Sequence, residues 1–227
     1  MVVVGLAWSL VSTAGFGFAN FADLYLGVPC AIEYPELGRF LGRWVMLTFQ
    51  TNVFCLGYSL LCTGLCTAAA TWPSRELDEW VVRLFPLYFM LALFLTAGYY
   101  TTVHFNKSSR DGRKFFAENG YPYIILSKHA SHGHATALAL MMSAVLNEAP
   151  SVRHVIFSTG PFLLEYLLLT CLNYRLTGKW MYPFLDDAAK KNGVRGVALV
   201  MLIIIAIGAI CGLFGKIIID FRLHYWS

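Results

Sequence analysis

Residues 196–219 read GVALVMLIIIAIGAICGLFGKIII and contain one charged side chain, that of Lys216. A helix of about 20 apolar residues crosses the roughly 30 Å hydrocarbon layer of a bilayer. An uninterrupted apolar run of this length is typical of a membrane-spanning helix, because spanning strands alternate apolar and polar residues. The segment therefore predicts a helix that crosses a membrane.

The rest of the chain has the same apolar character. Of its 227 residues, 58% are hydrophobic and 13% are charged, whereas soluble domains carry about 25% charged residues. We therefore expect an all-α polytopic membrane protein, a bundle of about six transmembrane helices that forms a single domain over residues 1–227. The five further predicted spans are approximately 2–22, 44–70, 81–105, 123–147 and 154–174.

Several functional classes find no support in the sequence. The net charge is only +4, and no basic stripe alternates with stacking aromatics, so we expect no nucleic-acid partner. Cys62 and Cys66 have no second pair to complete a metal site, and we expect them to pack as small hydrophobes. Hydrolase and nucleotide-binding motifs such as G-x-S-x-G, H-E-x-x-H and G-x-x-x-x-G-K are missing. We expect no cofactor or metal, and the oligomeric state stays open.

The distribution of positive charge predicts the orientation in the membrane. Twelve of the 17 lysines and arginines are on the side of the membrane that holds the loops between the first and second, third and fourth, and fifth and sixth spans. The positive-inside rule places these loops in the cytosol, in either the endoplasmic reticulum or the plasma membrane. Asn106-Lys107-Ser108 is a glycosylation sequon on the same side, and its use would reverse the assignment.

Two features inside the spans are unusual. Glu165 lies in FLLEYLLL, where an acid is costly unless it is paired or faces a polar cavity. It is either a functional residue or a protonated carboxyl bonded to a neighbouring helix. Gly160-Pro161 is expected to interrupt the same span, and with Glu165 it supports a transporter or interaction protein as an alternative function. Gly208 and Gly212 predict close helix packing, within the chain or between two chains.

Histidines gather in SKHASHGHAT, residues 127–136. On a regular helix His129 and His132 share one face, while His134 points to nearly the opposite side. The pair supports acid–base chemistry or, as an alternative, a haem- or metal-binding membrane protein in which His104 is a further ligand.

A hydroxyl is expected at the same depth as one of these imidazoles. Arg43 and Trp44 form a typical interfacial anchor, and Thr48 lies about 7.5 Å deeper on a helix. His132 lies about 6 Å deeper than Lys128, on a span that enters from the same side. The spacing does not exclude three other hydroxyls, those of Thr51, Ser127 and Ser131.

Three segments of the chain, in order, resemble one known family. They are Gly42-Arg43-Trp44 with Leu47-Thr48, then His129-Ala130-Ser131-His132, then Thr177-Gly178-Lys179-Trp180-Met181-Tyr182-Pro183. These segments are similar to the G/A-R-W-x-x-x-T, H-[AG]-x-H and T-G-x-W-x-Y-P segments of the androgen-induced and androgen-dependent TFPI-regulating membrane proteins. The similarity covers roughly residues 40–185. It implies a threonine hydrolase of fatty acid esters of hydroxy fatty acids, with Thr48 as nucleophile and His132 as its partner.

The resemblance also guides the choice of substrate-binding candidates, and it has gaps. Arg43 and Lys128 are candidates for holding a substrate carboxylate by charge-assisted hydrogen bonds. The other candidates around the lipid ester are Trp44, His129, Trp180, Tyr182 and Glu165. The sequence departs from the family at Lys128, where asparagine is usual, at Gly133, where threonine is usual, and at Met142, where an acid is usual.

Overall fold

The computed structural model describes residues 2–33, 42–68 and 75–226 of the chain. Within these ranges every regular element is a helix and there is no strand, which confirms the all-α prediction. The α-helices are α1 (Val2–Phe21), α2 (Cys30–Glu33), α3 (Leu47–Ala68), α4 (Arg75–Gly98), α5 (Lys107–Glu118), α6 (Ile124–His132), α7 (Ala135–Ser143), α8 (Val152–Thr177) and α9 (Pro183–Trp226). Short turns of other helix types are η1 (Ala22–Leu26), η2 (Gly42–Val45) and η3 (Tyr99–His104).

Four helical stretches of the described residues are long and apolar enough to cross a membrane. They are Leu47–Ala68, Asp78–His104, Val152–Thr177 and Phe184–Tyr225. This is the composition of an integral membrane protein, as predicted, although the predicted number of six spans is not confirmed. The last two residues of the predicted span 44–70 lie outside the described residues.

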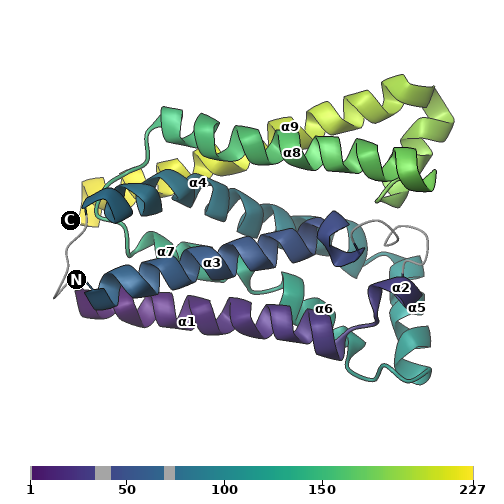
Figure 1. Ribbon diagram of the computed structural model, residues 1–227, viewed down its shortest axis with the longest axis horizontal. Coiled ribbons are helices and arrows are strands. Elements are labelled where there is room, and N and C mark those ends of the chain that lie inside the picture. Colours follow the sequence, from purple (N-terminus) through teal and green to yellow (C-terminus); the bar gives the residue numbers. More distant parts are fainter. Residues whose placement is uncertain (1, 34–41, 69–74, 227) are drawn as a thin grey trace.

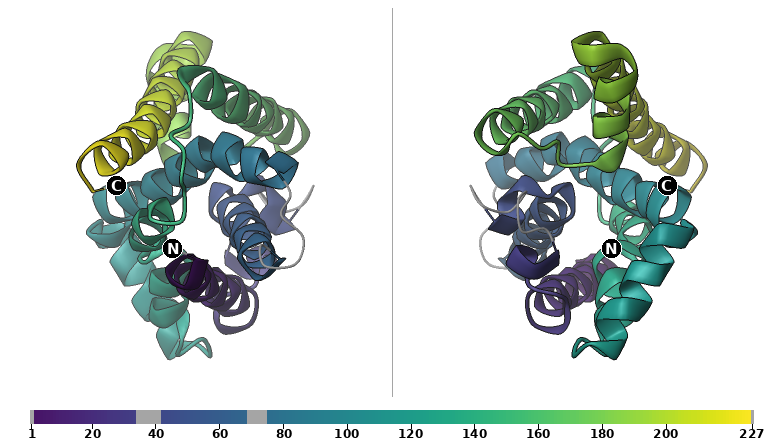
Figure 2. Two further views of the ribbon diagram at one scale, coloured as in Figure 1. Left: turned by 90° about the vertical axis from the view of Figure 1, so that its left-hand side faces the viewer. Right: turned by 90° about the vertical axis from the view of Figure 1, so that its right-hand side faces the viewer.

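The helix α4 lies in the middle of the molecule. It contacts α3 and α7 on one side and α8 and α9 on the other, while α1 packs against α3 and α7. Figure 1 shows this order, with α1 along the lower edge and the α8–α9 pair along the upper edge. The two ends of the chain lie near the same end of the bundle, and Figure 2 looks at the molecule from that end and from the opposite end.

The interior around α4 combines large aromatics with paired hydroxyls. Phe85 and Tyr88 are fully buried, and Tyr88 stacks on Tyr58 of α3 with ring centroids 4.4 Å apart. The Ser12 hydroxyl of α1 is 2.7 Å from that of Ser59 and 2.9 Å from that of Tyr88. Because apolar surroundings leave a polar side chain no water to bond, these contacts satisfy the hydroxyls and join three helices.

Two sequence predictions about helix continuity have different outcomes in the structure. The segment 123–147 contains two nine-residue helices, α6 and α7, separated at Gly133 and His134, and not one continuous helix. The interruption predicted at Gly160-Pro161 is wrong, because α8 runs unbroken from Val152 to Thr177. A proline near the solvent- or lipid-facing side of a long helix is tolerated when neighbouring turns still form their bonds.

The α9 helix shows two uses of glycine. Gly193 has a φ of 59°, a left-handed conformation that L side chains avoid, and it separates the first turns of α9 from the long remainder. A Cβ at Gly208 would lie 3.1 Å from Leu163 of α8, and one at Gly212 would lie 3.1 Å from Thr159. The predicted close-packing glycines therefore seat α9 against α8 within the chain.

Candidate active site

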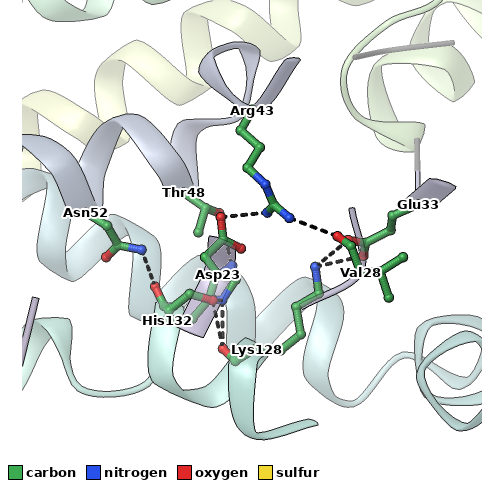
Figure 3. Close-up of polar contacts among 9 residues, drawn as sticks. Asp23, Val28, Glu33, Arg43, Thr48, Asn52, Lys128 and His132 are labelled. Carbon is green, nitrogen blue, oxygen red and sulfur yellow. Dashed lines mark hydrogen bonds and ion pairs between the residues drawn. The ribbon is translucent and has the colours of Figure 1, made fainter. Parts of the chain in front are cut away.

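Thr48 and His132 lie together, as the depth argument predicted. Thr48 is in the first turn of α3, and His132 is the last residue of α6. Thr48 Oγ1 is 3.0 Å from His132 Nε2, which is a good hydrogen-bond distance (Figure 3). Two residues 84 positions apart in the chain thus form a hydroxyl–imidazole pair, the arrangement in which a base can activate a nucleophile.

The second ring nitrogen of His132 fixes the direction of this hydrogen bond. His132 Nδ1 is 2.8 Å from the backbone oxygen of Lys128 and 2.8 Å from Ser131 Oγ, a hydroxyl that can accept as well as donate. A carbonyl oxygen only accepts, so Nδ1 carries the proton and donates it. In the neutral ring Nε2 is then the acceptor, and the Thr48 hydroxyl donates to it. This is the tautomer that a general base needs, with a backbone carbonyl in the orienting position that a carboxylate often fills.

The break between α6 and α7 places His132 at a helix end, and Thr96 of α4 stabilises that break. The Thr96 hydroxyl donates to the His132 carbonyl at 2.8 Å and accepts from the Thr136 backbone N–H at 3.3 Å. Both backbone groups would otherwise lack partners where the helix is interrupted. A Cβ at Gly133 would lie 2.8 Å from the Tyr100 hydroxyl, so the close approach here requires glycine.

Two further contacts hold the pair in place. The Tyr99 ring stacks on the His132 ring with centroids 4.4 Å apart and planes 25° apart. Asn52, one helical turn after Thr48, donates to the Ser131 carbonyl at 3.0 Å, and so joins α3 directly to the end of α6. Asn20 of α1 in turn donates to the Asn52 carbonyl at 3.1 Å.

Sequence reasoning did not find Thr96, Tyr99 or Asn52. Asn52 had a signal, since Gln50-Thr51-Asn52 is a polar run inside an apolar span and Asn52 is spaced to face the same way as Thr48. Thr96 and Tyr99 had none, because threonine and tyrosine are ordinary in an apolar helix.

Two ion pairs flank Thr48 and His132. Arg43 Nη1 is 2.7 Å from Asp23 Oδ2, and Arg43 Nη2 donates to the Val28 carbonyl at 2.9 Å. Lys128 Nζ is 2.7 Å from Glu33 Oε1. The four charged side chains are 10–17% exposed, and Figure 3 shows them beside Thr48 and His132. The structure thus places both predicted carboxylate-binding cations at the site, each already paired with a carboxylate of the chain.

The three predicted aromatic site residues pack against other aromatic side chains. Trp44 is half exposed and packs edge-on against Phe49. The Tyr182 hydroxyl is 2.9 Å from that of Tyr166, and both Tyr182 and Leu47, the neighbour of Thr48, pack against the cluster of Tyr166 and Met181. Trp180 instead stacks on Tyr174 with ring centroids 4.2 Å apart.

His129 and Glu165 have surroundings of their own. His129 Nδ1 is 3.1 Å from the Tyr100 hydroxyl, and its ring centroid is 4.9 Å from that of His104. The structure therefore gives His129 and His132 different hydrogen-bond partners. Glu165 lies at an exposed position on α8, and among the described residues it makes no hydrogen bond or ion pair with Thr48 or His132. Among residues 2–33, 42–68 and 75–226, no three His, Cys, Asp or Glu side chains are grouped to hold a metal ion.

Rival nucleophiles are placed less favourably. Thr51, Ser127 and Ser131 have no exposed surface, so a substrate reaches none of them without a rearrangement. Ser131 does contact His132, but at Nδ1, at 2.8 Å. Cys30 lies outside the spans, and burial raises the pKa of its thiol, which disfavours the reactive thiolate.

Comparisons of the sequence with protein-family models and curated proteins, and of the chain with solved structures, gave no match. The chemistry of the site therefore rests on its geometry and on the three motif segments.

Proposed function

We propose that this protein is an intramembrane lipid esterase that hydrolyses fatty acid esters of hydroxy fatty acids, with Thr48 as nucleophile and His132 as general base. The observation that carries the proposal is the 3.0 Å contact from Thr48 Oγ1 to His132 Nε2, with Nδ1 bonded to a carbonyl. The substrate class follows from the three motif segments and from a site near the ends of apolar helices.

In the first step the Thr48 oxygen attacks the ester carbonyl carbon, and the Thr48 proton moves to His132 Nε2. Collapse of the tetrahedral intermediate breaks the ester C–O bond. His132 returns the proton to the departing alkoxide of the hydroxy fatty acid, and an acyl-threonine remains. Water then attacks the acyl carbonyl while His132 takes its proton. Collapse of this second tetrahedral intermediate breaks the bond from Thr48 Oγ1 to the acyl carbon, and His132 returns the proton to Thr48 Oγ1 as the fatty acid leaves.

The ion-paired cations set conditions for the substrate. Arg43 and Lys128 lie next to the pair, but Asp23 and Glu33 already neutralise them. A substrate carboxylate gains most from Arg43 if it shares the guanidinium with Asp23, since the planar group has five N–H donors. Tyr182, Trp44 and Trp180 supply aromatic surface for the acyl chains at the level of the headgroups.

The proposal includes six membrane crossings, with α1 and the α6–α7 pair added to the four long apolar stretches. The loop that contains α5 and the loop before α9 then lie in the cytosol, in the endoplasmic reticulum or plasma membrane. Glycosylation of Asn106 in cells would place these loops in the lumen and contradict this orientation.

A matched pair of variants tests the catalytic proposal. Membranes that contain Thr48→Val or Thr51→Val would be given a fluorophosphonate probe and a fatty acid ester of a hydroxy fatty acid. Thr48→Val should lose labelling and at least about a thousandfold in hydrolysis, because the nucleophile is gone. Thr51→Val, which removes a buried hydroxyl that has no hydrogen-bond partner among the described residues, should keep both. Equal activity of Thr48→Val and the parent chain would exclude the proposal.

A further inference from the structure

A second site lies at the opposite end of the bundle from Thr48. A cavity of about 500 Å³ opens between α4 and α8, where Trp80 and Arg83 face Arg153, His154 and Phe157. Its volume falls in the range of about 300–1,000 Å³ that is usual for ligand sites. Figure 2 (left) looks at this end of the molecule, where both helices begin.

The polar side chains that line the cavity are Arg83, Arg153, His154 and Ser158, and aromatic rings hold both arginines. The Arg83 guanidinium lies 5.5 Å from the Trp80 ring centroid, and that of Arg153 lies 5.5 Å from the Phe157 centroid. An aromatic ring holds a guanidinium by its face and leaves the N–H groups at its edge available. Arg83 also bonds Glu79 at 2.9 Å through one nitrogen, which leaves most of its five donors for a ligand.

His154 adds a donor from the first turn of α8. Its Nδ1 accepts from the Ser151 backbone N–H at 3.3 Å, and the Ser151 hydroxyl accepts from the His154 backbone N–H at 3.1 Å. With Nδ1 as acceptor, the proton of the neutral ring is on Nε2, which is then a donor. The amino-terminal end of α8 adds positive potential beside it. Three side chains from two helices thus bring N–H donors to the lining of one cavity, an arrangement that suits a phosphate.

The position of the cavity favours a lipid phosphate over a soluble one. Arg83 is about 7.5 Å along α4 from Asp78, where the apolar stretch begins, and Arg153 is in the first turn of the stretch in α8. Both cations therefore lie at the headgroup level of a bilayer. Below them, Ile156 and Phe157 are 60% and 68% exposed, and Leu164 continues this apolar face of α8, against which acyl chains can lie.

We propose that this cavity binds the phosphate group of an anionic membrane lipid, with Arg83 and Arg153 as the principal contacts and the acyl chains along α8. Basic pockets between membrane helices are known to take lipid headgroups. The cavity is independent of Thr48 and His132, since it lies at the opposite end of the bundle from these two residues.

Native mass spectrometry of the full chain tests this proposal. The protein would be released from nanodiscs of phosphatidylcholine with phosphatidylglycerol, and the bound lipid would be counted. The parent chain should retain phosphatidylglycerol in preference to phosphatidylcholine. Arg83→Gln with Arg153→Gln should weaken that retention by roughly twentyfold or more. The control, Arg110→Gln with Arg175→Gln, removes two exposed arginines outside the cavity and should change it little.

Two further measurements separate the possible outcomes. Arg83→Lys with Arg153→Lys keeps the charge but loses the planar fork, so it should fold normally and retain an intermediate amount of lipid. Equal losses in the cavity and control variants would mean unspecific surface charge and would overturn the proposal. Displacement of the lipid by inorganic phosphate at equal concentration would overturn the assignment to a membrane lipid.

Discussion

The two ends of the bundle both carry arginines, but the surroundings of these arginines differ. At the Thr48 end, Arg43 is 17% exposed and bonds both Asp23 and the Val28 carbonyl. At the other end, Arg83 is 46% exposed, has one ion pair with Glu79, and faces a cavity. At the Thr48 end the charges are paired within the chain, beside a hydroxyl and an imidazole that lie 3.0 Å apart. The second end leaves donors available for a ligand.

The largest difference between the ends should appear in catalysis. His132→Gln removes the base, and we expect hydrolysis to fall by about 10²- to 10⁴-fold. His129→Gln, three residues earlier on the same helix, should keep most of the activity because its ring bonds Tyr100 and not Thr48. Initial rates on the lipid ester measure both variants. Equal loss in the two would mean that the histidine pair acts together, as in the alternative of a metal or haem site.

The second largest difference between the two ends should appear in how much each ion pair contributes to stability. Asp23→Asn leaves Arg43 charged and only partly hydrated, and we expect a loss of about 1–3 kcal/mol in unfolding free energy. Glu79→Gln breaks a pair whose side chains are nearly half exposed, and should cost less than about 1 kcal/mol. Thermal unfolding in detergent compares the two. The swap of Asp23→Arg with Arg43→Asp should recover part of the loss, and no recovery would argue against a direct pair.

Asn52 should have a smaller effect that joins stability to catalysis. Asn52→Leu removes the bond to the Ser131 carbonyl, and interhelical hydrogen bonds in membranes contribute about 0.6 kcal/mol on average. We expect a loss of about 0.5–1.5 kcal/mol and a severalfold lower rate, because α3 and α6 no longer hold Thr48 and His132 in register. Asn119→Ala removes an exposed hydrogen bond to the Phe115 carbonyl within α5, and as the control it should leave the rate unchanged.

The smallest effect tests whether the two ends are independent. Arg83→Gln with Arg153→Gln should change the hydrolysis rate by less than about twofold, although it removes retained phosphatidylglycerol. Sites without shared contacts usually contribute additively. A large loss of hydrolysis in this variant, with normal thermal unfolding, would mean that the lipid site and the catalytic pair are coupled.

The sequence was sufficient to predict the class of fold and the identity of the pair. Long apolar runs force helices, because only helices and closed barrels satisfy backbone groups in a bilayer. The helical rise from Arg43 to Thr48 is similar to that from Lys128 to His132, and this similarity predicted that Thr48 and His132 lie at one depth. This worked because each residue is only about one turn from its interfacial cation, so small irregularities in the helices did not accumulate.

The parts that the sequence did not predict depend on contacts between helices. The break at Gly133 relies on the hydrogen bond from Thr96 of α4. The composition of residues 123–147 does not indicate this break, because the segment is one apolar run. The pairing of Arg43 with Asp23 depends on how the chain returns after α1, and local spacing does not determine this. The prediction of an interruption at Gly160-Pro161 was wrong because it considered the local sequence alone. This residue pair breaks isolated helices, but α8 packs against α4 and α9 and stays helical through it.

The most direct test of the catalytic pair is to locate the adduct. Purified parent chain would be treated with a fluorophosphonate, digested, and sequenced by mass spectrometry. We predict one modified residue, Thr48, and no adduct after His132→Gln, because the hydroxyl then has no base. An adduct on Ser127, on Ser131 or on any other residue, with Thr48 unmodified, would contradict the assignment of the nucleophile.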